Sequence, residues 1–231
     1  MKRLIILFVV SFCFFLEANA EEQVISVFEH DAPIQKRINE TGFRILNANK
    51  LDKHVTFSYN NKNVLVKSDS SVIKRQVTIY DKDLKQIETD DELAALIARE
   101  VSFAMKSFYG AFGGFISSLQ IKMAPKKYEI AADKRAVDYL VKAGYNPLGL
   151  ITYINKACPQ ARQDKISSRN LTSKRLMYIY EKIYFNYPYF LVNNTYIDNP
   201  YYQNFLLNSI ENRHLLEHKI RNRETGKLKY E

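Results

Sequence analysis

Three carboxylates have the spacing to converge on one site. Glu100 falls on the apolar face of a helix expected over residues 89–103, where hydrophobic residues recur every three or four positions. Glu129 and Asp133 are four residues apart and therefore share one face of a second expected helix, over residues 128–142. A carboxylate opposite a Glu-x-x-x-Asp pair is the layout of a metal-assisted peptidase, in which one carboxylate activates water and another binds the metal ion.

The two positions that would bind the metal ion from the first helix carry other side chains. In an HExxH zinc site, two histidines four residues apart bind the ion, and the glutamate after the first histidine is the general base. Arg99 and Phe103 occupy the two histidine positions. Glu100 fills the general-base position, Glu129 the third-ligand position and Asp133 the supporting position. The sequence therefore retains the acids of such a site without its two imidazoles.

Three blocks of the sequence, in order, resemble the zinc metallopeptidases related to the CAAX prenyl protease and HtpX. Residues 90–105 resemble their DELAAVLAHEIAH helix, residues 128–147 their ExEADxxGLxLLxKAGYDP helix and turn, and residues 168–176 their THPxTxxR segment. The resemblance spans about residues 75–185 and implies an α+β, mainly helical, gluzincin-like domain with a small antiparallel sheet. Arg169 aligns with a histidine that helps stabilise the transition state in that family, so the resemblance supports the fold and argues against the activity.

We expect Arg99 to take over the electrostatic role of the metal ion. Carboxylates that converge in a half-buried cleft repel one another unless a positive charge lies among them. A guanidinium can bridge Glu129 and Asp133, and Phe103 would fill the volume of the second imidazole. The same fixed charge repels a cation, so we expect no zinc, although the resembling family uses it, and a vestigial role for Glu100. The alternative is that the histidines were lost without a compensating ion pair.

The start of the chain has the pattern of a secretory signal peptide. Two basic residues precede an apolar run over residues 4–16 and an Ala-x-Ala site at residues 18–20. We expect cleavage after Ala20, and hence a periplasmic or secreted protein without a stable membrane span; a retained anchor is the alternative. Cys158 would then be the only cysteine, so no intramolecular disulfide can form.

The net charge is +9, which permits contact with anionic lipid, cell-wall polymer or an acidic protein. Nucleic acid is not expected as a partner, because an exported chain rarely meets it. The many Tyr and Phe residues over 178–206 are expected to pack in the core or against a protein partner rather than to form a ligand platform.

Local patterns place the remaining elements. After the signal peptide (1–20) we expect a degenerate metallopeptidase-like domain (21–185) and an aromatic-rich segment with a C-terminal helix (186–231) that packs on the domain or extends it. The expected elements are a helix with Pro33 in its first turn, a hairpin of strands 55–59 and 64–66, a strand at 76–80, and helices over 148–156, 172–185 and 201–223. The strand at 76–80 would lie at the cleft edge, either to bind substrate by strand addition or, as we favour, as an ordinary packed edge.

Two segments allow more than one interpretation. Gly110 to Phe115, with three glycines, predicts a loop that is either a lid over the cleft or a plain connector. His214-Leu-Leu-Glu217-His218 matches the inverted zinc motif H-x-x-E-H, but too little chain follows to supply the distant carboxylate ligand. We therefore favour two exposed histidines there. His30 and His54 have no partner at ligand spacing.

These observations favour an exported, catalytically inactive relative of the HExxH metallopeptidases that acts as a binding or scaffold protein. A protein or peptide partner would bind in the former cleft or on the C-terminal segment. Two alternatives remain open at this point: an active zinc endopeptidase with Glu100 as base and Glu129 as a ligand, and an envelope protein that binds cell-wall polymer.

Overall fold

The computed structural model describes residues 31–51, 55–62, 69–71, 75–105, 119–160, 171–224, 227–228 and 230. The expected signal peptide with its cleavage site, the strand at 64–66, the loop at 110–115, His30, His54 and Arg169 lie outside these residues. The chain divides into two units, Met1–Arg37 and Ile38–Glu231. The described residues of the first unit, 31–37, are helical, within a helix assigned over residues 31–48.

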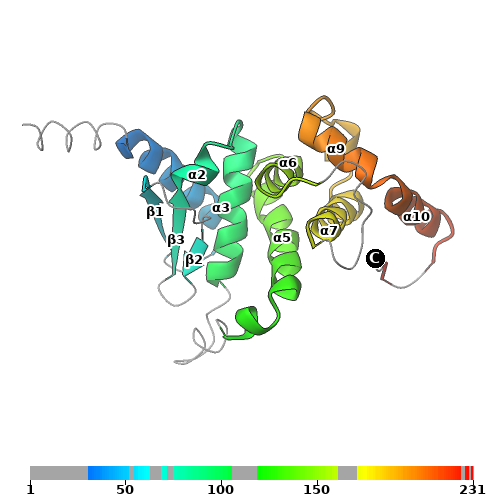
Figure 1. Ribbon diagram of the computed structural model, residues 1–231, viewed down its shortest axis with the longest axis horizontal. Helices are drawn as coiled ribbons and strands as arrows, with labels where there is room; N and C mark the ends of the chain where they lie inside the picture. Colours follow the sequence, from blue (N-terminus) through cyan, green and yellow to red (C-terminus); the bar gives the residue numbers. More distant parts are fainter. Residues whose placement is uncertain are drawn as a thin grey trace, which may run out of the picture. The chain divides into compact units, whose positions relative to one another are not determined.

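A three-stranded mixed sheet lies at one side of the second unit (Figure 1). Its strands are β1 (Thr56–Asn60), β2 (Asp69–Ser71) and β3 (Gln76–Tyr80), in the order β1-β3-β2. β3 pairs in parallel with β1 and antiparallel with β2, so the predicted purely antiparallel sheet is wrong. The predicted hairpin of strands 55–59 and 64–66 stays a prediction, because residues 64–66 lie outside the described residues. β3 is also central rather than at an edge, which corrects the expectation of a cleft-edge strand. Its Val77 and Ile79 are fully buried, as suits a strand that is paired on both sides.

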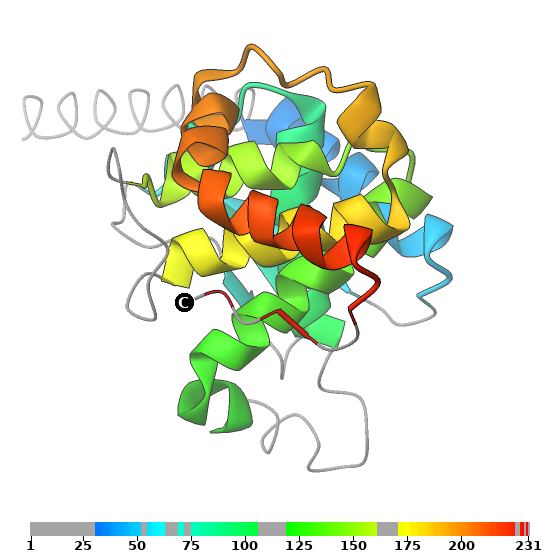
Figure 2. The same ribbon diagram turned by 90° about the vertical axis from the view of Figure 1, so that its right-hand side faces the viewer.

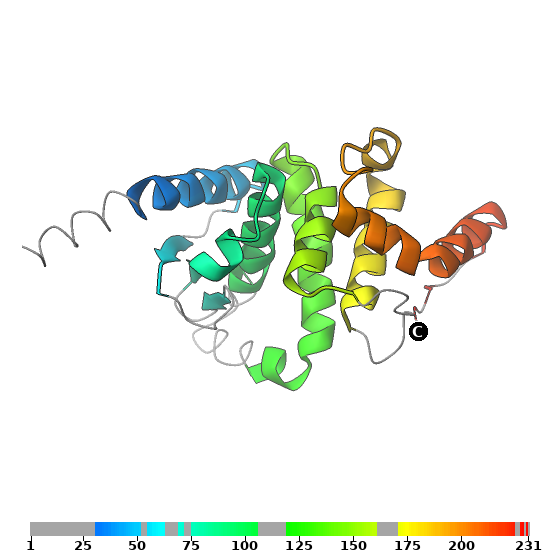
Figure 3. The same ribbon diagram turned by 45° about the horizontal axis from the view of Figure 1, so that its top comes forward.

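Helix α3 (Asp90–Ala104) packs against the sheet on one side and against α5 and α6 on the other (Figures 1 and 3). Its N-terminus forms as predicted, since the Thr89 side chain accepts a hydrogen bond from the Glu92 N–H at 3.2 Å. The Glu92 carboxylate accepts from the Glu88 N–H at 2.8 Å and pairs with Lys156 Nζ at 2.8 Å. The short helix α2 (Asp81–Leu84) connects β3 with the segment before α3. Eleven of the fifteen residues of α3 are buried, which makes it the central helix of the unit.

Helix α5 (Pro125–Lys142) ends at the predicted glycine. Gly144 has φ +77°, its N–H donates to the Val141 carbonyl at 3.0 Å, and the Tyr145 N–H donates to the Leu140 carbonyl at 3.0 Å. These two bonds form a Schellman motif. Helix α6 (Leu148–Ala157) then approaches the first turn of α3 closely, because a Cβ on Gly149 would lie only 2.8 Å from the Cβ of Asp91.

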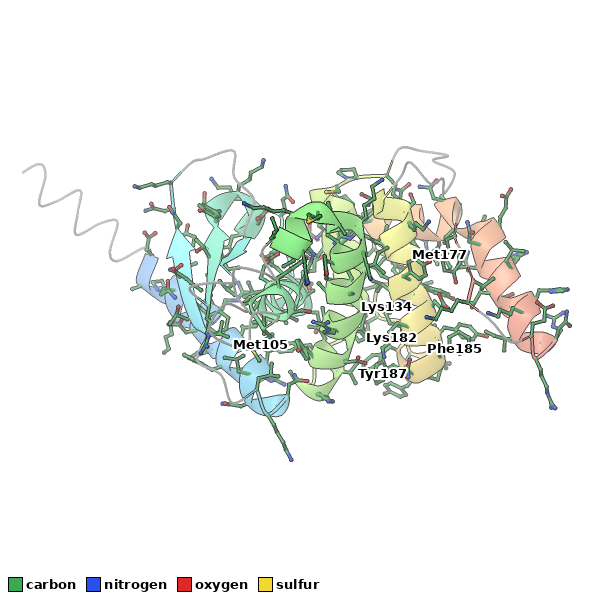
Figure 4. All side chains as sticks on the ribbon, turned by 90° about the horizontal axis from the view of Figure 1, so that it is seen from below. Met105, Lys134, Met177, Lys182, Phe185 and Tyr187 are labelled. Carbon is green, nitrogen blue, oxygen red and sulfur yellow. The ribbon has the colours of Figure 1, made fainter. Side chains whose placement is uncertain are left out.

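Helix α7 (Leu171–Asn186) packs on α5 and α6. Thr172 is already inside this helix, so it is not the predicted cap. At the other end of α7 the two helices are joined through Asp138 of α5, which accepts a hydrogen bond from the Tyr187 hydroxyl at 2.7 Å and pairs with Lys182 at 3.0 Å. Figure 4 shows Lys182 and Tyr187 close together beside α5.

The C-terminal segment forms three helices, α8 (Tyr189–Val192), α9 (Pro200–Asn208) and α10 (Ile210–Arg221). The single helix predicted over 201–223 is therefore wrong. It breaks at Ser209, whose Oγ donates to the Phe205 carbonyl at 2.7 Å and competes with the helical backbone bonds. Tyr196, Tyr202 and Phe205 are buried, so part of the aromatic segment packs in the core. In the part of the chain that the structure describes, no helix combines the length and the apolarity that a membrane crossing requires.

Candidate functional site

The predicted carboxylates meet where α3, α5 and α7 come together. Glu100 of α3 and Asp133 of α5 are buried, with 3% and 0% of their surface exposed. The side chain of Glu129, one turn before Asp133, is 28% exposed. Glu100 and Asp133 lie on the buried faces of their helices, as the 3.6-residue period predicts. The site is thus a carboxylate cluster at a helix interface, half open at Glu129.

Arg99 lies between two of the acids. Its Nη1 donates to Glu100 Oε1 at 2.7 Å and its Nε donates to Asp133 Oδ1 at 3.2 Å. Only 16% of the Arg99 side chain is exposed. Burial acts to lower the pKa of Arg99, but the Glu100 and Asp133 carboxylates outweigh it and the pKa is raised overall. The guanidinium is therefore a fixed positive charge between the two buried carboxylates.

A second guanidinium, from Arg175 of α7, completes the cluster. Its Nε donates to Asp133 Oδ2 at 2.6 Å and its Nη2 to Asp133 Oδ1 at 3.0 Å, while its Nη1 pairs with Glu129 Oε2 at 3.2 Å. This corrects one expectation from the sequence: Arg175 bridges Glu129 and Asp133, whereas Arg99 bridges Glu100 and Asp133. The sequence carried a signal for Arg175, which closes the block at residues 168–176 at the arginine position of THPxTxxR.

Phe103 and Tyr153 border this cluster. The Phe103 ring centroid lies 5.2 Å from Cζ of Arg99, within the range of a cation–π contact. Tyr153 of α6 is 6% exposed, and sequence reasoning gave it no role. Burial raises the pKa of Tyr153, and the Asp83 carboxylate adds to this, so the phenol is neutral at physiological pH. An aromatic ring and a phenol thus border the ionic cluster.

The cluster does not fit a zinc ion. Catalytic zinc needs three protein ligands, most often imidazoles, around an open position. Here both histidine positions are filled by Arg99 and Phe103, and each of the three carboxylates already pairs with a guanidinium. Among the residues with described placement, no group of three or more His, Cys, Asp and Glu side chains is arranged to hold a metal ion. The arrangement can hold the helices together, and each of its three carboxylates is engaged by a guanidinium.

The inverted motif on α10 is separate from this cluster. His214 and His218 are both exposed, and His218 Nδ1 lies 3.7 Å from a carboxylate oxygen of Glu224. The His218 side chain is 68% exposed, and its ring nitrogens lie 3.1 and 3.2 Å from the Asn222 amide nitrogen. The two histidines are therefore surface residues of a C-terminal helix.

Comparison with known proteins gives no family for the chain. No protein-family model matches the sequence, and the search of curated proteins finds no match.

Proposed function

We propose that this chain is an exported, non-catalytic protein of metallopeptidase-like architecture that acts by binding a protein or peptide partner. The observation that carries the proposal is the ionic cluster of Arg99, Arg175, Glu100, Glu129 and Asp133. Its two guanidinium groups carry together the formal charge of one zinc ion. The acids that would surround the ion are thus neutralised to the same extent by fixed side chains.

This neutralisation supports a scaffold rather than a catalyst. Water activation needs a carboxylate that can accept a proton and a metal ion that polarises the water. The Oε1 oxygen of Glu100 is engaged by Arg99 at 2.7 Å, and Asp133 receives bonds from both arginines. Guanidinium–carboxylate bonds of this kind are strong and directional. They stabilise the resting geometry of the cluster, which supports a binding role over a catalytic one.

The surface of the C-terminal helices supports the binding role. Val192, Tyr189 and Leu207 expose 82%, 68% and 66% of their surface. Large apolar side chains that together form a contiguous exposed patch are typical of surfaces that bind another protein. We take these three side chains to belong to such a patch. A partner that covers these side chains would gain about 25 cal/mol for each Å² of apolar surface removed from water.

A cleavage assay tests the absence of catalysis. The purified chain is incubated with casein in the presence and absence of added zinc and of a chelator, beside its Glu100→Gln variant. We expect no cleavage above the level of the variant under any of these conditions. Cleavage that the chelator abolishes and that Glu100→Gln lacks would overturn the proposal in favour of an active peptidase.

Site-directed photo-crosslinking tests the binding role. A photoreactive residue at Val192, expressed in the source cell, should give a discrete crosslinked species, and the same probe at Glu40 on helix 31–48 is the control. Glu40 is exposed and lies outside the C-terminal helices. The species should disappear when Tyr189 and Leu207 are changed to Asp. Equal crosslinking at both probe positions, or at neither, would contradict partner binding at this surface.

A further inference from the structure

A surface at the start of α5 combines exposed apolar and exposed basic side chains. Residues 119–123 form a helical turn just before α5, in which Leu119 and Met123 expose 49% and 78% of their surface. The two residues are four positions apart and share one face of the turn. Lys122, Lys126 and Lys127 are exposed around them. We call these five residues the α5 tip.

The α5 tip projects from the helical body. In Figures 1 and 2 the bright green turn lies at the lower end of the molecule, beyond the ends of α6 and α7 and away from α9. Figure 4, which views the molecule from below, shows the same turn in front of α5. A planar partner could therefore reach the α5 tip without meeting the C-terminal helices.

The sequence around the α5 tip has a charge bias of its own. From Val101 to Tyr128 the chain contains no Asp or Glu and four lysines, whereas the whole chain has 25 acidic residues in 231. The first acid of α5 is Glu129, which is paired with Arg175 at 3.2 Å. An apolar pair flanked by three exposed lysines is complementary to a surface that offers hydrocarbon beneath negative charge. An anionic lipid bilayer has these two properties, since its headgroups attract lysine and its acyl boundary takes up apolar side chains.

We propose that the α5 tip binds the surface of anionic membranes. Leu119 and Met123 enter the headgroup region, and Lys122, Lys126 and Lys127 contact the phosphate groups. Long lysine side chains suit this position because their methylene groups follow the apolar surface while the ammonium stays at the headgroups. The binding is peripheral, and it does not depend on the proposed loss of catalysis.

Vesicle co-sedimentation tests the proposal. The protein used begins at Glu21, which keeps every residue that the structure describes and removes the apolar run at 4–16. It is mixed with vesicles of phosphatidylcholine alone or with phosphatidylglycerol. We expect binding to the anionic vesicles only, and we expect it to weaken as salt screens the lysines. Equal binding to both vesicle types, or none to either, would overturn the proposal.

Matched variants locate the contact. Changing Lys122, Lys126 and Lys127 to Gln should lower the partition coefficient about a hundredfold, at about fivefold for each lysine. The control changes Lys62, Lys142 and Arg221 to Gln, which removes the same charge from exposed positions elsewhere. The control should lower binding much less. If the control variant loses as much vesicle binding as the tip variant, net charge alone drives binding. That result would contradict the assignment of the α5 tip as the membrane contact.

The apolar contribution is tested in the same way. Leu119→Ser with Met123→Ser should lower partitioning by about tenfold or more for each buried side chain. Ile210→Ser with Leu215→Ser is the control, because both side chains are exposed but belong to α10. Circular dichroism confirms that all variants fold. Unchanged binding in the Leu119 and Met123 variant would overturn the proposed insertion.

Discussion

Replacing Arg175 by Met removes a side chain that makes three contacts in the ionic cluster. Arg175 gives Asp133 two hydrogen bonds, at 2.6 and 3.0 Å, and pairs with Glu129 at 3.2 Å. The side chain of Asp133 is 1% exposed, so water cannot replace the lost donors. Breaking a buried ion pair by removing one partner costs about 3–5 kcal/mol. Asp133 keeps its bond to Arg99, so we expect a loss near the lower limit, about 3 kcal/mol of the free energy of unfolding.

Urea unfolding followed by circular dichroism at the helical band measures this loss. The matched control is Lys182→Met on the same helix, which removes the half-exposed pair with Asp138 at 3.0 Å. Such a surface pair contributes about 0–1 kcal/mol. Arg175→Lys keeps the positive charge but lacks the planar guanidinium, so its free energy of unfolding should lie between those of Arg175→Met and Lys182→Met.

A double-mutant cycle assigns the loss to the pair itself. Asp133→Asn should also destabilise the protein, and the combination with Arg175→Met should cost less than the sum of the two single changes, because each removes the same contact. If the free energy of unfolding of Arg175→Met lies within about 1 kcal/mol of the wild-type value, or is no lower than that of Lys182→Met, the cluster is not the structural unit that we describe.

Three further changes test the surroundings of the site. Thr89→Ala should lower the free energy of unfolding by about 1–2 kcal/mol in the same urea experiment, because it removes the α3 cap and the 3.1 Å contact with the Tyr196 hydroxyl. A loss below about 0.3 kcal/mol would refute the role of Thr89 as a cap. Gly144→Ala should lower the free energy of unfolding by about 1–2 kcal/mol, because a φ of +77° is unfavourable for a residue with a Cβ. An unchanged midpoint of urea unfolding would contradict this prediction. Burial, followed by the hydrogen bond to Asp138, raises the pKa of Tyr187 to about 12. The folded state therefore holds this proton more tightly, and the resulting stability is present below about pH 10 and lost as the pH rises towards about 12. Tyr187→Phe should show a smaller fall in stability across that window than the wild type, and an identical fall in the two proteins would refute the assignment.

The features that could be predicted from the sequence depend on neighbouring residues. The Thr89 cap, the glycine end of α5 at Gly144 and the bounds of α6 each follow from a few adjacent side chains, and the structure has them. The apolar face of α3 likewise placed Glu100 inside, since helical period alone determines that face. Local chemistry was sufficient wherever a segment decides its own conformation.

The features that could not be predicted depend on partners far along the chain. The pairing of β1 with β3 is set by tertiary packing, and no turn signal encodes it. Apolar periodicity continues through Ser209, so the sequence pattern does not predict the helix break there. The break depends on the hydrogen bond from Ser209 Oγ to the Phe205 carbonyl. Three acids and two arginines allow several pairings, and the position of α7 decides that Glu129 pairs with Arg175 rather than with Arg99.

The zinc content of the purified chain tests the central claim most directly. Protein produced with zinc in the medium is dialysed, and its metal is measured by mass spectrometry beside a variant in which Arg99 and Phe103 are both changed to His. The wild type should carry far less than one zinc per chain, because Arg99 and Arg175 already neutralise the acids. Stoichiometric zinc in the wild type, lost when Glu129 is changed to Ala, would contradict the claim that guanidinium groups stand in place of the ion.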